Sequence, residues 1–158
     1  MKIWLPTTEI VTVEGYYTLL WGDKHGNLKE VQHVKNLITT AAKESWAKHH
    51  RGLTTNNQGI GTYHALGTSA VAPALGDTQL GTELFRKLIS VRDEVNNASR
   101  FQTFFTTDEG NGDLKEVGLF GDDADGDADS GTLFSHLAIN RTKTSSDTLT
   151  LLHTMTFG

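Results

Sequence analysis

The stretch EIVTVEGYYTLLW, residues 9–21, decides the fold class. β-Branched and aromatic residues dominate it and alternate with other residues, which is typical of a β-strand. Residues 22–27, GDKHGN, then supply turn-forming residues, and residues 28–36, LKEVQHVKN, return to a strand pattern. Together the three stretches predict a β-hairpin.

The same kind of pattern continues through most of the chain and predicts a mainly β protein. Short strand-like stretches are separated by turn-rich sequences, which favours a β-sandwich or jelly-roll-like domain. We expect a single β-rich domain over residues 1–158. The further predicted strands are IGTYHAL (60–66), ELFRKLISVRDEV (83–95), SRFQTFFTT (99–107), LKEVGLF (114–120), TLFSHLAIN (132–140) and DTLTLLHTMTF (147–157).

One segment departs from the strand pattern and predicts a packed α-helix at about residues 37–51. Asn36 is a candidate N-cap and Gly52 a stop signal. We expect Trp46 and His49 to lie in the core and at its edge rather than in a binding site. The residues that recur at helical spacing are Ile38, Ala41, Ala42, Ser45, Trp46 and His49.

Apolar positions on these elements predict the core. The predicted core residues are Ile38, Trp46, Phe101, Phe105, Val117, Leu119, Leu133, Leu137, Leu149 and Leu151. YYTLLW (16–21) and ELFRKLISV (83–91) carry apolar residues on both strand faces, and a sandwich hides only one face of each sheet. We therefore expect a homo-oligomer, either a trimer or a hexamer.

Composition narrows the classes of partner. The 158 residues carry a net charge of −5 and contain no basic run longer than Arg86-Lys87, which argues against nucleic-acid binding. No apolar run is long enough to span a membrane, and the apolar stretch at the N-terminus is too short for a signal peptide. We expect that the protein does not associate with a membrane. We expect that it is assembled in a cytoplasm. Without cysteine there is neither a disulfide nor a thiolate metal site.

HALGTSAVAPALG, residues 64–76, raises the question of a catalytic serine at Ser69. Gly-Thr-Ser followed by Pro resembles the nucleophile region of subtilisin-like proteases, and His25-Gly26 and Asp129-Ser130-Gly131 supply similar fragments. Those proteases carry Asp, His and Ser in that order, whereas the order here is His, Ser, Asp. The loop also leads into strand-like sequence rather than a helix. We predict a non-enzymatic protein without catalytic or cofactor-binding residues.

GDDADGDADSG, residues 121–131, is the candidate calcium loop. Asp123, Asp125 and Asp127 occupy alternate positions, like the first ligands of an EF-hand. Ala128 replaces the required Gly, and Phe134 replaces the bidentate Glu. A mobile, solvated hairpin tip is favoured, with a looser calcium site as the alternative. The seven histidines show no two-ligand spacing on a common helix face except the adjacent His49-His50, which would point in different directions, so zinc is not expected.

Four stretches of the C-terminal two-thirds resemble a group of small structural proteins of tailed bacteriophages. They are YHALGTSAVAPALGDTQLGTELFRK (63–87), FQTFFTTDEGNGDLKEVGLFG (101–121), SGTLFSHLAI (130–139) and KTSSDTLTLLHTMTF (143–157). A segment like KNLIT, residues 35–39, commonly precedes them in those proteins. The loop around Ser69 matches a loop with no catalytic role there, and the extended Asp-rich tip is a departure.

The resemblance implies a β-rich, non-enzymatic component of the virion, assembled in the host cytoplasm with other virion structural proteins as partners. A tail, fibre-attachment or baseplate component is the leading interpretation, and a capsid decoration protein is the alternative. A module that binds host glycans is a third interpretation, in which Tyr16, Tyr17 or Trp21 would stack on a sugar ring.

Overall fold

A computed structural model describes residues 12–52 and 58–158, so residues 9–11 of the first predicted strand and most of the loop before residue 60 lie outside it. The described chain forms nine strands and one helix. They are β1 (Val13–Asp23), β2 (Leu28–Ile38), α1 (Thr40–His50), β3 (Gly61–Gly67), β4 (Glu83–Leu88), β5 (Val91–Val95), β6 (Ala98–Phe105), β7 (Gly112–Gly121), β8 (Thr132–Lys143) and β9 (Asp147–Phe157).

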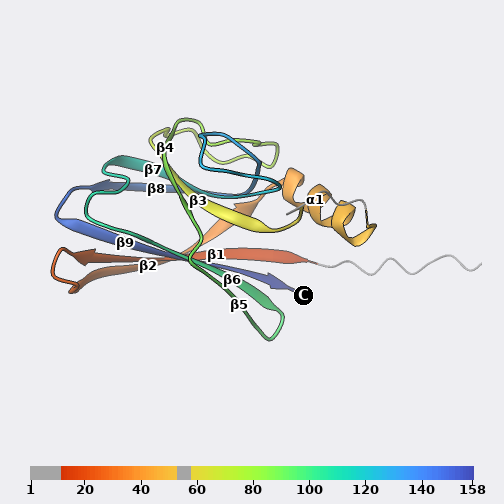
Figure 1. Cartoon of the computed structure of the whole chain (residues 1–158), viewed down its shortest axis with the longest axis horizontal. Coiled ribbons are helices and arrows are strands. Elements are labelled where there is room, and N and C mark those ends of the chain that lie inside the picture. Colours follow the sequence, from red (N-terminus) through yellow and green to blue (C-terminus); the bar gives the residue numbers. More distant parts are fainter. Residues whose placement is uncertain (1–11, 53–57) are drawn as a thin grey trace, which may run out of the picture.

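All nine strands belong to one antiparallel sheet with the order β4-β3-β7-β8-β2-β1-β9-β6-β5. The sheet curls into two facing layers, with β2, β1, β9, β6 and β5 below and β4, β3, β7 and β8 above (Figure 1). A mainly β domain with one packed helix is therefore confirmed. The two layers are halves of one continuous sheet.

At two of the places where the chain passes between the layers, its backbone is hydrogen-bonded to both of them. Leu37 and Ile38, at the end of β2, pair with β8 of the upper layer. On the opposite side, the Ile89 amide donates to Thr62 of the upper layer, and the next amide, Ser90, donates to Gln102 of the lower layer. The single strand predicted over residues 83–95 is therefore wrong, because it divides here into β4 and β5.

The β1–β2 hairpin is confirmed. Its turn is held by Asp23, whose carboxylate accepts hydrogen bonds from the amides of His25 and Asn27 and from the Asn27 side chain. The side-chain bond from Asn27 is the main cause that lowers the pKa of Asp23 to about 2. Gly26 adopts a φ of 85°, which favours glycine.

The helix begins at Thr40, three residues later than predicted, and its N-cap is Thr39 instead of Asn36. The Thr39 hydroxyl accepts from the Ala42 amide at 3.1 Å and donates to the Leu133 carbonyl at 2.6 Å. The helix starts later because Leu37 and Ile38 are still part of β2 and pair with β8. Gly52, with a φ of 70°, follows the last turn as predicted.

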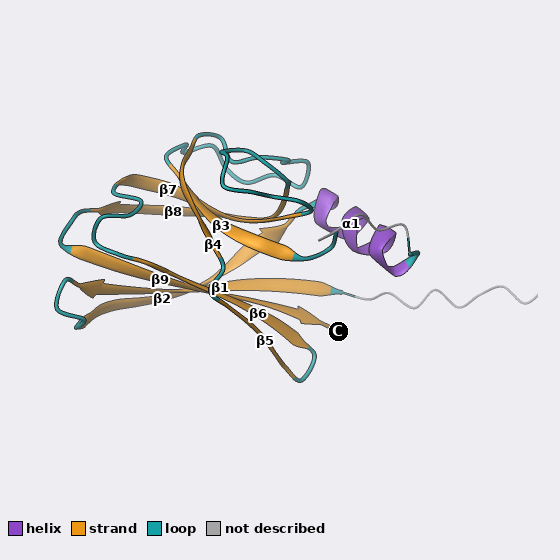
Figure 2. Ribbon diagram, in the orientation of Figure 1, coloured by secondary structure: helices purple, strands orange, loops and turns teal. Residues whose placement is uncertain are grey.

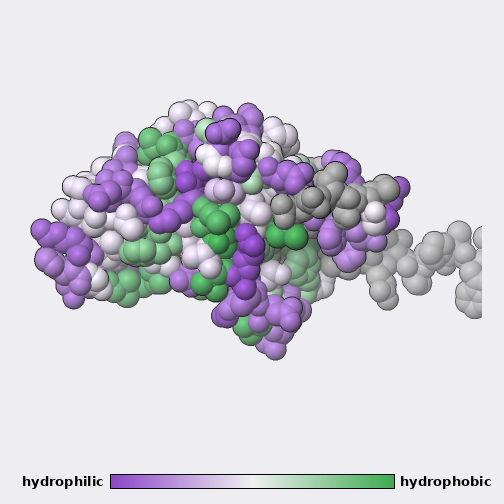
Figure 3. Space-filling view, viewed as in Figure 1, coloured by the Kyte–Doolittle hydropathy of each residue, from purple (hydrophilic) through white to green (hydrophobic). Residues whose placement is uncertain are grey.

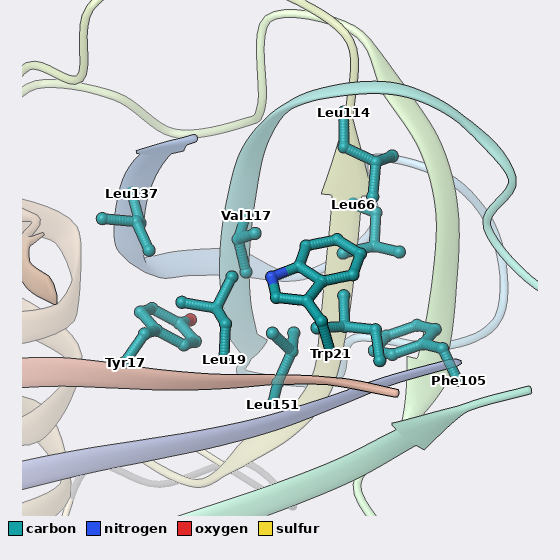
Figure 4. Close-up of a cluster of buried hydrophobic side chains, with 10 residues drawn as sticks. Tyr17, Leu19, Trp21, Leu66, Phe105, Leu114, Val117, Leu137 and Leu151 are labelled. Carbon is teal, nitrogen blue, oxygen red and sulfur yellow. The ribbon is translucent and has the colours of Figure 1, made fainter. Parts of the chain in front are cut away.

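The core lies between the two layers. Nine of the ten predicted core residues are buried, and Trp46 is half-buried at one end, where it packs edge-on against Phe134 and Phe157. Figure 4 shows Leu19, Trp21 and Leu151 of the lower layer pointing toward Leu66 and Val117 of the upper layer.

Long loops gather on the upper layer, whereas most turns of the lower layer are tight (Figure 2). Two of them, residues 68–82 and 122–131, lie side by side there, and Leu80 and Ala124 share one apolar cluster. These two loops hold Ser69 and the Asp-rich segment, whereas His25 lies in the β1–β2 turn.

Candidate functional site

Ser69, His25 and Asp129 lie on three separate connections. Ser69 is in the β3–β4 loop, His25 in the β1–β2 turn and Asp129 in the β7–β8 loop. The Ser69 hydroxyl accepts a hydrogen bond from the Val71 amide, and the Asp129 amide donates to Glu83. No hydrogen bond among the described residues joins any two of the three, so the fold does not assemble them into a triad.

The loop around Ser69 is instead held by a buried carboxylate, Glu116 of β7, which is 1% exposed. Its oxygens accept hydrogen bonds from the backbone amides of Ser69, Gly81 and Thr82, with donor–acceptor distances of 2.9–3.2 Å. The two ends of the loop lie close together, because a Cβ on Gly81 would clash with the Ser69 hydroxyl oxygen. Glu116 therefore fixes both ends of the loop against the upper layer.

His136 of β8 extends this network. Its Nε2 lies 2.9 Å from Glu116, and its Nδ1 lies 2.7 Å from Asp77, which also accepts the Ala74 amide. With both nitrogens occupied, His136 offers Ser69 no basic nitrogen. The network is suited to positioning the loop rather than to acyl transfer.

The Asp-rich loop is anchored by Arg86 of β4. The guanidinium donates to the carbonyls of Asp125 and Ser130 and forms a two-point ion pair with Glu83. The Arg86 and Glu83 side chains are 3% and 2% exposed. The guanidinium also lies 4.5 Å from the Phe120 ring centroid.

The first carboxylate of this loop, Asp122, accepts hydrogen bonds from the Ser45 hydroxyl and the Gly59 amide, whereas the alternate carboxylates that follow are at the surface. Asp123, Asp125 and Asp127 are exposed, as predicted, and a hydrogen bond from Ser130 is the main cause that lowers the pKa of Asp125. Among the described residues, no group of three or more His, Cys, Asp or Glu side chains has a metal-binding arrangement. The arginine that orders the base of the loop was missed by the sequence analysis, because it lies 35 positions before the loop begins.

Two of the three suggested sugar-stacking residues are buried. Tyr17 and Trp21 point into the core and are 0% exposed, which rules them out as surface contacts. Tyr16 lies on the outer face of the lower layer, where its ring already stacks on His33 with a centroid distance of 5.2 Å. On the helix, His49 is exposed, whereas Trp46 is half-buried.

A polar layer crosses the core beside Tyr17. The Tyr17 ring stacks on His153 at 4.3 Å, and its hydroxyl pairs with Ser135 at 2.9 Å. His64 pairs with Thr103, and His153 pairs with Asn36. Burial lowers the pKa of His64 to about 3 and is the main cause that lowers the pKa of His153 well below its ordinary value. Both rings are therefore neutral in the folded protein at neutral pH.

The outer face of the lower layer carries an apolar band that crosses all five strands. Leu20 lies opposite Val31 on one side and Thr150 on the other, and Phe104 follows beyond Thr150. We define the outer band as Leu20, Val31, Val91, Phe104 and Leu152. Val31, Val91 and Phe104 are 53%, 46% and 45% exposed.

A shallow hollow of about 380 Å³ lies along this band between Leu20, Leu28 and Phe104. In the space-filling view, hydrophobic patches interrupt the hydrophilic surface of the lower layer (Figure 3). The band brings exposed apolar side chains from five neighbouring strands onto one face, which is suited to contact with another protein surface.

No protein-family model, curated protein or solved structure matches this chain. Among the described residues, no helix is long and apolar enough to cross a membrane.

Proposed function

We propose that this protein is a non-catalytic structural component of a tailed-bacteriophage virion, located in the tail, the fibre attachment or the baseplate. The observation that carries the proposal is the outer band, which offers a broad apolar face for assembly. Soluble monomers rarely leave contiguous apolar patches larger than about a few hundred Å² exposed. The sequence resemblance described above supports the assignment to a phage particle.

The chemistry of the loops is consistent with this role. The polar side chains that suggested catalysis, such as Glu116, His136 and Arg86, are used in hydrogen bonds that hold the loops in place. A rigid scaffold with an apolar outer face is suited to a closed symmetric assembly, in which each copy buries the same face. The proposed assembly is a trimer or a hexamer that contacts other virion structural proteins.

Light scattering on the purified chain tests self-assembly. We expect a mass of three or six times 17.3 kDa. The variant Phe104→Lys places a charge in the outer band and should reduce the mass to that of one chain. Val71→Lys is the matched control, because Val71 is 71% exposed on the β3–β4 loop, away from the band. An unchanged mass for Phe104→Lys would exclude the outer band as the assembly surface.

Mass spectrometry and imaging of purified particles test the location. We expect the chain in intact virions, assembled in the host cytoplasm before release. Imaged density on the tail supports the leading interpretation, and density on the capsid lattice supports the alternative of a decoration protein. Absence of the chain from intact particles would refute both.

A further inference from the structure

A groove of about 760 Å³ opens between α1 and the neighbouring ends of β1 and β2. Figure 1 shows α1 standing beside the start of β1 at one end of the molecule. We call this cavity the fork groove. Apolar side chains line much of its surface, namely Val13, Ile38, Trp46, Leu75 and Phe157. Its volume lies in the range of about 300–1,000 Å³ that is typical of ligand sites.

The groove lies where two paired strands separate. Gly15 and Asn36 are the last residues that pair between β1 and β2 at this end. Beyond them, β2 leaves for the upper layer, where Ile38 lies opposite Ser135 of β8. The first residues of β1 therefore have a strand on only one side, which is β9.

The backbone of Val13 points into this fork. Thr12 and Gly158 exchange two hydrogen bonds, at 2.7 Å and 2.9 Å, so they form a hydrogen-bonded pair between β1 and β9. Because such pairs alternate along an antiparallel ladder, the amide and carbonyl of Val13 face away from β9. No described residue of β2 lies opposite Val13. A donor and an acceptor are thus presented side by side at a sheet edge.

The lining of the groove holds one lysine, Lys43, in excess of its carboxylates. Glu14 and Lys35 form an ion pair at 2.7 Å, which leaves Lys43 and His50 as the other charged or titratable groups of the lining. None of the described carboxylates forms a salt bridge with Lys43 or His50. In a chain with a net charge of −5, this local excess of positive charge favours an acidic ligand.

We propose that the fork groove binds an extended, acidic segment of a partner protein, which adds a strand beside the start of β1. The segment pairs with the Val13 backbone, inserts an aromatic or aliphatic side chain among the apolar lining residues, and places a carboxylate near Lys43. Strand addition is a common mode of peptide recognition, in which backbone bonds supply affinity and side-chain pockets supply specificity. The unpaired amide and carbonyl of Val13 favour a peptide over a lipid or another small molecule. The groove is separate from the outer band.

Fluorescence anisotropy with labelled heptapeptides tests the proposal on the full chain. One peptide alternates Glu with Phe and Val, and the second replaces each Glu with Lys while keeping the apolar residues. We expect saturable binding of the acidic peptide and about tenfold weaker binding of the basic one. Equal affinity for the two peptides, or no binding of the acidic peptide, overturns the proposal.

Two variants locate the binding site. Lys43→Glu should weaken binding of the acidic peptide by about tenfold, whereas Lys48→Glu, exposed on the same helix but outside the groove lining, should leave it unchanged. Val13→Pro removes an amide that takes no part in pairing with β9. It should weaken binding about fivefold without lowering the melting temperature by more than a few degrees.

Two further results would overturn the proposal. Equal effects of Lys43→Glu and Lys48→Glu would indicate nonspecific attraction and overturn the proposed site. A labelled peptide with the sequence of residues 1–11, MKIWLPTTEIV, is the competing occupant. If it binds more tightly than the acidic heptapeptide, the groove belongs to the chain's own N-terminal segment and not to a partner.

Discussion

Glu116 is a single residue on which the position of a long loop depends. Its buried carboxylate is the acceptor for three backbone amides and a partner of His136. We expect Glu116→Ala to lower the free energy of unfolding by about 3 kcal/mol or more, because buried donors lose their acceptor. Glu116→Gln keeps one oxygen and should lose less. Glu94→Ala, on exposed β5, is the control and should stay within about 0.5 kcal/mol of the wild type in chemical denaturation.

His64 and His153 make stability depend on pH. Their pKa values lie far below 6.5 in the folded protein, whereas in the unfolded chain both titrate near 6.5. As the pH falls from 6.5 toward 4, the unfolded chain therefore takes up more protons. The free energy of unfolding should fall by about 1 kcal/mol per pH unit for each ring, with no contribution from these rings above 6.5.

Urea denaturation at pH 7.5, 6 and 5 measures this slope. His64→Asn removes one titrating ring while keeping a hydrogen-bonding group near Thr103, and it should reduce the slope by about half. His25→Ala, in the exposed hairpin turn, should keep the wild-type slope. Equal stability at pH 7.5 and pH 5 in the wild type would contradict the buried, neutral state of the two rings.

Local sequence identified the loop around Ser69 but not the residues that control it. Gly-Thr-Ser and a nearby proline drew attention to residues 64–76, whereas the controlling side chains are Glu116 and His136, on β7 and β8. A glutamate in a strand has the same sequence appearance whether it is solvated or buried against backbone amides. Only the antiparallel pairing of β7 with β3 brings it under the loop.

At the scale of elements, the start of α1 rests on Thr39. Replacing it with alanine removes the acceptor of the Ala42 amide and the donor to Leu133. We expect Thr39→Ala to cost about 1 kcal/mol, within the range of about 0.5–2 kcal/mol for lost N-caps. Thr39→Ser keeps the hydroxyl and should melt near the wild-type temperature. Equal melting of the serine and alanine variants would mean that the hydroxyl does not stabilise the helix start.

The β7–β8 loop should hold its position without calcium. Its base is held by Arg86, which hydrogen-bonds the carbonyls of Asp125 and Ser130. We therefore expect EDTA to leave the melting temperature unchanged. Arg86→Ala should cost about 3–5 kcal/mol, because it leaves the Glu83 carboxylate buried without its partner. A clear drop in melting temperature with EDTA would support the looser calcium site.

The sequence predicted which elements exist better than where they begin and end. Strand alternation located β1, β2, β6 and β9 within a few residues, because in each strand one face is less exposed than the other. The helix start was wrong because Leu37 and Ile38 fit a helical face and a strand end equally well. The division of residues 83–95 was missed because Ile89 and Ser90 pair with different layers, which is a property of the curled sheet and not of local pattern.

At the scale of the whole molecule, apolar residues on both strand faces were visible in the sequence, but their assignment to inside and outside was not. YYTLLW alternates so that Tyr17, Leu19 and Trp21 are buried while Tyr16 and Leu20 face outward. The opposite assignment would keep the same periodicity. It is the hairpin register and the pairing with β9 that select the buried set and leave the outer band at the surface.

The position of β9 has a consequence for biosynthesis. This last strand lies between β1, the first, and β6, and its pairing with β1 reaches from Thr12 to Gly158. Until β9 has been made, β1 lacks its neighbouring strand on one side, and the same holds for β6 once it has been made. Unpaired strand edges are templates for aggregation. A nascent chain that stalls before residue 147 lacks β9 and cannot complete its sheet, so it should depend on chaperones. The sheet of this protein is therefore completed only after the ribosome has made β9, however early β1 and β2 have paired.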